Sequence, residues 1–259
     1  MSDFMDVLAR VAQITIESEY YDGIKSTKSI HLSLKQAILN CKVNPVIAEI
    51  KAASPSAGVI RRNVKASVIA KAIERGGAVA LSVLTEPKQF DCSLDALAQA
   101  RKAVKLPILM KDIILSPLQI QAASKLGANA ILLIKTLYDR GYSEKTVDEM
   151  INGAHLMGLE VLLETHTLSE FVSALKTDAD LIGINNRNLA TLKVDLDVTK
   201  SILQSINPKN KVIVSESGIN TPVDILFLRK SGASAFLIGS AIMKSDNVEE
   251  KVKEFVNAK

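Results

Sequence analysis

Residues 46–84 read VIAEIKAASPSAGVIRRNVKASVIAKAIERGGAVALSVL and contain two kinds of pattern. Both ends of the stretch are short, nearly continuous apolar runs rich in Val, Ile and Leu, which are typical of strands buried on both faces. Between them, residues 67–77 carry apolar side chains at helical spacing, and Gly76-Gly77 suits the end of a helix. The stretch therefore predicts a strand, a helix and a second strand.

The same unit recurs along the chain at intervals of roughly 20 to 35 residues. Helical segments at 116–128 and 221–233 each begin with Ser or Thr followed by Pro, as helices commonly do. The eight apolar runs are VIAEI (46–50), VALSVL (79–84), PILMK (107–111), AILLI (130–134), EVLLE (160–164), LIGIN (181–185), KVIVS (211–215) and AFLIG (235–239). Eight consecutive units predict an α/β protein with a single (β/α)8 TIM barrel. A doubly wound open sheet is the alternative, but no G-x-G-x-x-G motif follows the first run.

Residues 1–44 precede the first apolar run and have helical spacing at 3–14 and 31–40. They predict an N-terminal helical extension packed on the barrel, because a segment of this length rarely forms a core of its own. Residues 45–259 are then the barrel, and the whole chain is one domain. The first residues mix charged and apolar side chains, which is not the pattern of a signal peptide.

Charge and cysteine content argue against several classes of protein. The net charge is +4, and the densest basic spot, Arg61-Arg62 with Lys65, is short and has no interleaved aromatic residues, so we expect no nucleic-acid binding. No apolar run approaches the ~18 residues that cross a bilayer, so we expect no membrane insertion. Cys41 and Cys92 form neither a disulfide framework nor a metal-binding spacing, which favours a reduced, cytoplasmic protein.

Polar and charged side chains recur where the apolar runs end. Side chains alternate along a strand, and active sites of barrels lie at the carboxyl ends of the strands. The residues at this end are Glu49, Lys51, Lys111, Glu164, Asn185, Arg187 and Glu216. Each could instead reach solvent on its own, but their recurrence at one end favours a shared cluster. In such a cluster a lysine keeps its proton and serves as a general acid, and a crowded glutamate holds a proton near neutrality.

Two glycine-containing loops after the last two runs suggest an anion site. SESGIN (215–220) contains Gly218, and IGSAIM (238–243) contains Gly239-Ser240, where a short extra helix can begin. Glycines let the backbone approach an anion, and barrels often bind phosphate in the loops after the seventh and eighth strands. We therefore favour phosphate binding over the alternative that these glycines only end turns.

The three histidines, His31, His155 and His166, have no spacing that suits a metal site or a catalytic triad. We interpret each as a surface or helix-end residue. The sequence therefore predicts no metal site.

Several motifs, in order along residues 46–243, resemble those of the indole-3-glycerol phosphate synthase family of tryptophan biosynthesis. They are IAEIKAASPSAG, SVLTEPKQFDCSL, LPILMKDIIL, EVLLETH, IGINNRNL, VSESGI and FLIGSAIM. The resemblance implies that 1-(2-carboxyphenylamino)-1-deoxyribulose 5-phosphate is closed to an indole ring with loss of CO₂ and water. It also implies that neither a metal nor an organic cofactor takes part. The partner would be this phosphorylated small molecule, and the protein a monomer, with weak association to other enzymes of the pathway left open.

The resemblance also implies roles for individual residues. The catalytic set would be Lys111, Glu164, Lys51, Glu49, Asn185, Glu216 and Ser217. Lys111 would be the general acid of ring closure, and Glu164 would handle the proton of dehydration, a task that Lys51 and Glu49 could share. The residues that hold the substrate's phosphate and carboxylate would be Ser54, Arg187, Gly218, Gly239 and Ser240. Phe90 and Pro55 would flank its aromatic ring.

The sequence departs from the family's pattern at several positions. The family often has another basic residue just after the lysine at position 51, where Ala52 and Ala53 follow here, and a lysine before the glycine at position 58, where Ala57 stands here. The loop at 52–62, a predicted mobile lid, therefore has less positive charge with which to hold the substrate. Cys92 replaces a glycine and Ile113 an aromatic residue, and both could loosen the ring pocket. Two other functions stay open: sugar-phosphate isomerisation or aldol chemistry through a Schiff base on a lysine, and a barrel that only binds ligands.

Overall fold

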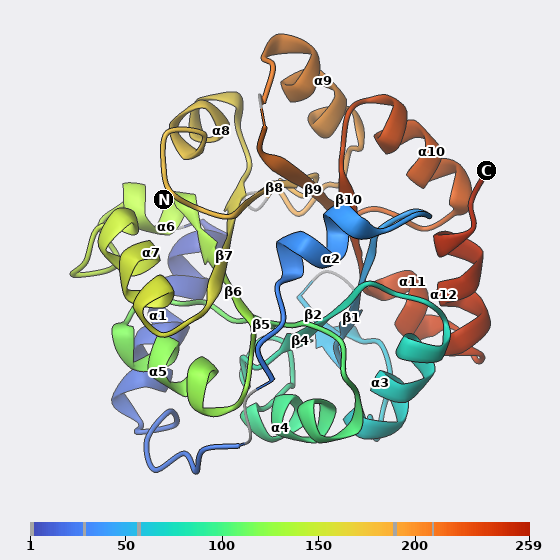
Figure 1. The fold of residues 1–259 in the computed structure, drawn as a ribbon. Helices are drawn as coiled ribbons and strands as arrows, with labels where there is room; N and C mark the ends of the chain where they lie inside the picture. Colours follow the sequence, from blue (N-terminus) through green and yellow to red (C-terminus); the bar gives the residue numbers. More distant parts are fainter. Residues whose placement is uncertain (1–2, 28–29, 56–57, 189–190, 209) are drawn as a thin grey trace.

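In a computed structural model that describes residues 3–27, 30–55, 58–188, 191–208 and 210–259, eight parallel strands close into a barrel (Figure 1). The barrel closes because the first strand pairs with both the second and the last strand of the ring. The strands are β1 (Val46–Ile50), β4 (Ala80–Leu84), β5 (Ile108–Lys111), β6 (Ala130–Ile134), β7 (Glu160–Thr165), β8 (Leu181–Asn185), β9 (Val212–Glu216) and β10 (Ala235–Ile238). Each predicted apolar run forms one strand, so the (β/α)8 barrel is confirmed and the open sheet is excluded.

A ring of helices surrounds the barrel (Figure 1). They are α3 (Ala66–Arg75), α4 (Leu94–Ala103), α5 (Pro117–Lys125), α6 (Lys135–Asp139), α7 (Val147–Leu156), α8 (Leu168–Ala174), α9 (Asp197–Ser205), α10 (Pro222–Lys230), α11 (Ser240–Lys244) and α12 (Val248–Val256). The local signals act as predicted: the Ser116 hydroxyl accepts the backbone N–H of Leu118 at 3.3 Å, and the Gln119 side chain accepts that of Ser116 at 3.1 Å. After α3 the chain turns through Gly77, whose φ of +88° is one that L side chains rarely adopt.

Strand alternation divides the apolar residues into two cores. Val46, Ala48 and Ile50 of β1 belong to the layer between strands and helices, whereas Ile47 belongs to the interior of the barrel. The same alternation continues along β1 and directs Glu49 inward. The barrel interior is therefore filled with apolar side chains toward the amino ends of the strands and with polar side chains at their carboxyl ends.

The N-terminal extension contributes one helix to each end of the barrel. Leu34 and Ile38 of α2 (Leu34–Asn40) pack into the inner core, and α2 lies across the opening that faces the viewer in Figure 1. Glu160, at the start of β7, ties this helix down by accepting hydrogen bonds from the Ser33 hydroxyl and the Lys35 amide. At the opposite end, α1 (Phe4–Glu17) buries one apolar face and lines the mouth of the barrel.

A short hairpin follows β1 and covers part of that mouth. It consists of β2 (Ala53–Ser54) and β3 (Gly58–Val59), and the Ala53 amide donates to the Phe90 carbonyl at 3.1 Å. Residues 56–57, including Ala57, lie outside the described residues, so the predicted lid at 52–62 is described only in part. None of the helices in the described ranges is long and apolar enough to cross a membrane.

Candidate active site

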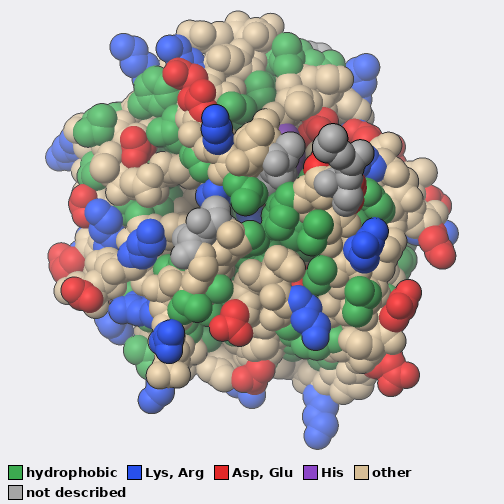
Figure 2. All heavy atoms as spheres, turned by 180° about the vertical axis from the view of Figure 1, so that it is seen from behind, with side chains coloured by type: hydrophobic (Ala, Val, Ile, Leu, Met, Phe, Trp, Pro, Cys, Tyr) green, Lys and Arg blue, Asp and Glu red, His purple; other side chains and the backbone are tan. Residues whose placement is uncertain are grey.

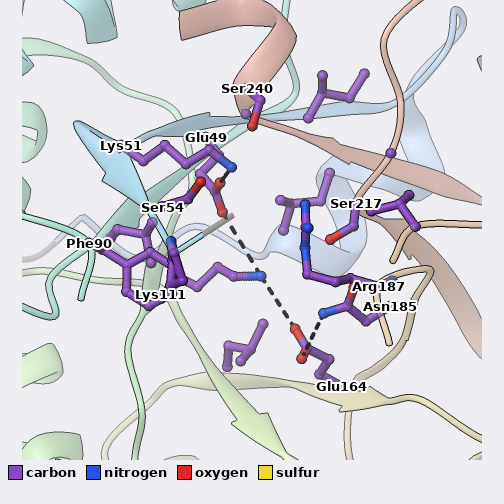
Figure 3. Close-up of a pocket in the computed structure, with 18 of the residues that line it drawn as sticks. Glu49, Lys51, Ser54, Phe90, Lys111, Glu164, Asn185, Arg187, Ser217 and Ser240 are labelled. Carbon is purple, nitrogen blue, oxygen red and sulfur yellow. Dashed lines mark hydrogen bonds and ion pairs between the residues drawn. The ribbon is translucent and has the colours of Figure 1, made fainter. Parts of the chain in front are cut away.

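Lys111, the last residue of β5, lies at the centre of a cluster of buried carboxylates (Figure 3). Its Nζ atom is 2.8 Å from Glu216 Oε2, 3.4 Å from Glu164 Oε2 and 3.9 Å from Glu49 Oε2. The three glutamates come from β9, β7 and β1, which are far apart in the sequence but adjoin the same mouth. Closure of the barrel therefore assembles the cluster.

A second ion pair lies beside this cluster, where Lys51 Nζ is 2.7 Å from Glu49 Oε1. Gly239, just after β10, makes room for the pair: a Cβ atom there would overlap Glu49 Oε1 and lie 2.9 Å from Lys51 Nζ. Gly183 on β8 plays the same part for Glu216, because a Cβ atom there would overlap Glu216 Oε1. A side chain at either position would therefore force a charged group of the site to move.

Lys111, Glu164 and Glu216 differ in how the site shifts their pKa values. Burial opposes the charge on Lys111, but Glu216, Glu164 and Glu49 outweigh it and raise its pKa above the usual range. Burial likewise opposes ionisation of Glu164, but Lys111, His166 and Asn185 together outweigh it and hold the pKa of that carboxyl below its usual range. For Glu216, burial dominates and, despite Lys111, raises the pKa to about 7. The site therefore holds a protonated lysine, an ionised glutamate and a glutamate that titrates near neutrality.

His166 joins the cluster, contrary to the interpretation of this residue as only a surface or helix-end position. It does lie just before α8, but its side chain is 10% exposed and its Nε2 atom is 3.2 Å from Glu164 Oε1. The same carboxylate oxygen accepts a hydrogen bond from Asn185 Nδ2 at 3.1 Å. A signal was present in the sequence, because residues 164 and 166 are two apart, like Glu49 and Lys51.

The side of the mouth formed after β9 and β10 has the features of an anion site. Ser217 and Gly218 both have left-handed backbone, with φ of +67° and +85°, and α11 begins at Ser240 as predicted. Arg187 is held in place because its Nη1 atom donates to the Leu192 carbonyl at 3.1 Å. Lys244, at the end of α11, adds a basic side chain to this region.

The opposite wall of the pocket is apolar. Phe90 and Pro55 line it, together with Ile113. The carboxylate of Glu86 accepts the backbone N–H groups of residues 88, 89 and 90 at 2.6–3.1 Å, which fixes the turn that carries Phe90. This wall suits a flat, hydrophobic group.

Most of these residues line one cavity of about 310 Å³ at the mouth of the barrel. Figure 2 shows this face of the molecule, with a hollow near its centre among apolar side chains. Of the residues predicted from the sequence, those that line the cavity are Glu49, Lys51, Ser54, Pro55, Phe90, Lys111, Glu164, Asn185, Arg187, Ser217, Gly218, Gly239 and Ser240. Glu216 is fully buried beneath them, in contact with Lys111.

Sequence reasoning missed several lining residues. Phe4 and Leu8 of α1 lie in the pocket wall, although nothing in an isolated amphipathic helix shows where it docks. Cys92 lines a separate cavity, but its Sγ atom donates to the carbonyl of Phe90 at 3.2 Å, so its effect on the ring pocket stays a prediction. Burial raises the pKa of the Cys92 thiol to about 11.

Together, the barrel and its mouth are typical of an enzyme of the (β/α)8 class, with lysines and glutamates suited to acid–base chemistry beside an apolar wall. Comparison with known proteins agrees: the sequence profile of the indole-3-glycerol phosphate synthase family matches residues 5–255, and the chain belongs to this family. It is a carboxy-lyase of tryptophan biosynthesis that forms indole-3-glycerol phosphate.

Relatives named indole-3-glycerol phosphate synthase resemble the chain along most of its length. The protein from Methanocaldococcus jannaschii is 46% identical over 88% of this chain and 85% of its own length. The protein from Caldanaerobacter subterraneus is 39% identical over 93% and 91%, respectively. A thiamine phosphate pyrophosphorylase from Pyrococcus furiosus shares only the fold, with a TM-score of 0.61, 16% identity and coverage of 84% of this chain and 95% of that one.

Proposed function

We propose that Lys111 and Glu164 perform the acid–base steps by which this enzyme closes 1-(2-carboxyphenylamino)-1-deoxyribulose 5-phosphate to indole-3-glycerol phosphate. The observation that carries the proposal is the position of Lys111 Nζ, within 4 Å of three buried carboxylates and open to the cavity. In ring closure the ring carbon attacks the substrate's carbonyl carbon, and Lys111 gives a proton to the oxygen that becomes a hydroxyl.

The later steps need proton transfer at a second position. The carboxylate leaves as CO₂, and its bonding electrons neutralise the cationic ring left by ring closure and restore its aromaticity. The new hydroxyl then takes up a proton and leaves as water while a substrate proton is removed. Glu164 is ionised and so suits the removal of that proton, with Lys51 and Glu49 close enough to share the work. Because the substrate loses a carboxylate charge, each turnover takes up one proton from solvent.

The apolar wall of the cavity and the side with the features of an anion site would bind different parts of the substrate. Phe90 and Pro55 would flank the aromatic ring. Asn185 and Glu216 would orient the lysines and the sugar hydroxyls. The phosphate and the carboxylate would be held by Lys51, Ser54, Arg187, Gly218, Gly239 and Ser240, where backbone N–H groups and basic side chains meet. All of these belong to one chain, so we also propose that a monomer suffices for activity.

The contacts of Lys111 favour acid–base chemistry over a Schiff base. A lysine must lose its proton before its nitrogen can attack a carbonyl group. Three carboxylates hold Lys111 protonated, which suits a proton donor and opposes that attack.

The experiment is to measure turnover of the synthetic substrate by indole fluorescence in the Lys111→Ala variant. We expect kcat to fall by about 10²–10⁴, as is usual when a general acid is lost. Lys211→Ala is the matched control, because Lys211 is also partly buried and bonds carbonyls at 2.9 and 3.0 Å, but lies at the start of β9. Near-normal turnover of Lys111→Ala, or a covalent lysine adduct trapped by borohydride, would overturn the assignment.

A further inference from the structure

The Glu164 carboxylate has partners on both of its oxygen atoms. Oε2 faces Lys111, at 3.4 Å, and Oε1 faces both Asn185, at 3.1 Å, and His166, at 3.2 Å. Asn185 is neutral, so His166 is the group besides Lys111 that can stabilise negative charge on Glu164 by direct contact. His166 therefore contributes electrostatically to the site and does not only fill space.

A second carboxylate holds the imidazole from the other side. His166 Nδ1 lies 3.6 Å from Glu170 Oε2, and the backbone N–H of His166 donates to the same oxygen at 2.8 Å. Glu170 is itself fixed by Thr136, whose hydroxyl donates to Glu170 Oε1 at 2.9 Å. The ring thus lies between two carboxylates, at 3.2 and 3.6 Å, an arrangement that favours its doubly protonated, charged form.

We propose that His166 is a positioning residue: its imidazolium, held between Glu164 and Glu170, keeps the Glu164 carboxylate ionised and oriented toward Lys111. The inference rests on the proposed role of Glu164. His166 acts through Glu164 and gives no proton to the substrate. Its removal would therefore change the pH range in which the enzyme works more than the chemistry itself.

The charged groups around the pair set the expected titration. Those that face Glu164 are Lys111, Glu49, Glu216 and His166, and those that face His166 are Glu164 and Glu170, with the Thr136 hydroxyl as a neutral neighbour. Burial opposes the charge on His166, but the two glutamates outweigh it and raise its pKa from 6.5 to about 9. The imidazole is then charged at neutral pH and loses its proton only in alkaline solution.

The first test is a titration of the histidine signals of the intact protein by NMR. The chain contains only three histidines, and the variants His31→Gln and His155→Gln assign two of the signals, which leaves that of His166. We expect the His166 signal to titrate well above 6.5, and to shift to lower pH in Glu170→Gln. Titration of His166 at or below 6.5 would overturn the proposal, even if no His166 variant folds.

The second test is the pH dependence of kcat in His166→Gln, which keeps an N–H donor but loses the charge. Without the imidazolium, protonation of Glu164 becomes easier, so the acid limb of the profile should move by about one unit to higher pH, a tenfold loss of rate on that limb. His155→Gln is the matched control, because His155 pairs with Asp180 at 2.9 Å outside the catalytic mouth. Its profile should superpose on that of the wild type.

The outcomes separate the two proposals. If Glu164→Gln is inactive while the profile of His166→Gln equals that of the wild type, the positioning role fails and the proposed function stands. If Glu164→Gln keeps normal turnover, the proposed function itself fails. An equal loss of kcat at every pH in His166→Gln would mean that the histidine is only structural, and would also overturn the inference.

Discussion

Substitution of Gly183 by alanine tests whether Glu216 must occupy its observed place. Gly183 faces the barrel interior on β8, and a Cβ atom there would overlap Glu216 Oε1 and lie 3.3 Å from the Glu164 Cα atom. The backbone cannot yield easily, because β8 pairs with both neighbouring strands at this residue. The Glu216 side chain must therefore turn away, which breaks its 2.8 Å contact with Lys111 Nζ.

The expected loss follows from that contact. A hydrogen bond between charged groups contributes about 1.5–3 kcal/mol. Since about 1.4 kcal/mol corresponds to a factor of ten in rate, kcat/KM should fall by about 10- to 150-fold. The other contacts of Lys111, with Glu164 and Glu49, remain, so the loss should be smaller than that of removing the lysine.

The assay is indole fluorescence with the synthetic substrate, and circular dichroism checks that the barrel is intact. The matched control is Gly153→Ala in α7, where the nearest atom to a new Cβ is Ile120 Cδ1 at 3.9 Å. This change should leave kcat/KM unaltered and raise the free energy of unfolding by about 0.5–1 kcal/mol, the usual gain of alanine over glycine in a helix.

A double-mutant comparison isolates the mechanism. In a Glu216→Ala background the clashing oxygen is absent, so adding Gly183→Ala should cost almost nothing further. Wild-type kcat/KM for Gly183→Ala alone would refute the reasoning. An undiminished additional loss in the Glu216→Ala background would refute it as well, because the effect would then arise from somewhere other than Glu216.

Two further predictions concern the N-terminal segment. Arg140 donates to Asp3 through both of its terminal nitrogens at 2.8 Å and so holds the first turn of α1. Arg140→Ala should raise KM about two- to tenfold with little change in kcat. An unchanged KM in steady-state kinetics would contradict this. Asn44 is buried and donates to three carbonyls near the C-terminus at 2.9–3.3 Å. Asn44→Ala should lower the free energy of unfolding in urea by about 2–3 kcal/mol with unchanged kcat. Asn257→Ala, which removes an exposed hydrogen bond, should lower it by less than about 1 kcal/mol.

The barrel itself was predictable because its signals are local. Each strand is an apolar run of its own, and caps such as Ser116 and turns such as Gly77 act within a few residues. The alternation of side chains along a strand is also a local property. The inward direction of Glu49 and Lys111 could therefore be predicted from their positions in the apolar runs. A parallel sheet with short connections then leaves few topologies.

Other features of the site depend on contacts between segments distant in sequence. The distances that join Lys111 to Glu216 and to Glu164 arise from the register of strands that are far apart in the sequence, which no local pattern encodes. The same holds for Phe4 on α1, whose place in the pocket wall depends on where the whole helix packs.

The sequence by itself therefore determined the barrel, the end of it that carries the chemistry, and the side chains available there, since periodicity and residue type are properties of short segments. Only the tertiary structure decided which charge pairs with which. Burial and the distance between charges set the pKa of Glu216 near 7 and that of His166 near 9, and both quantities exist only once the eight strands have closed.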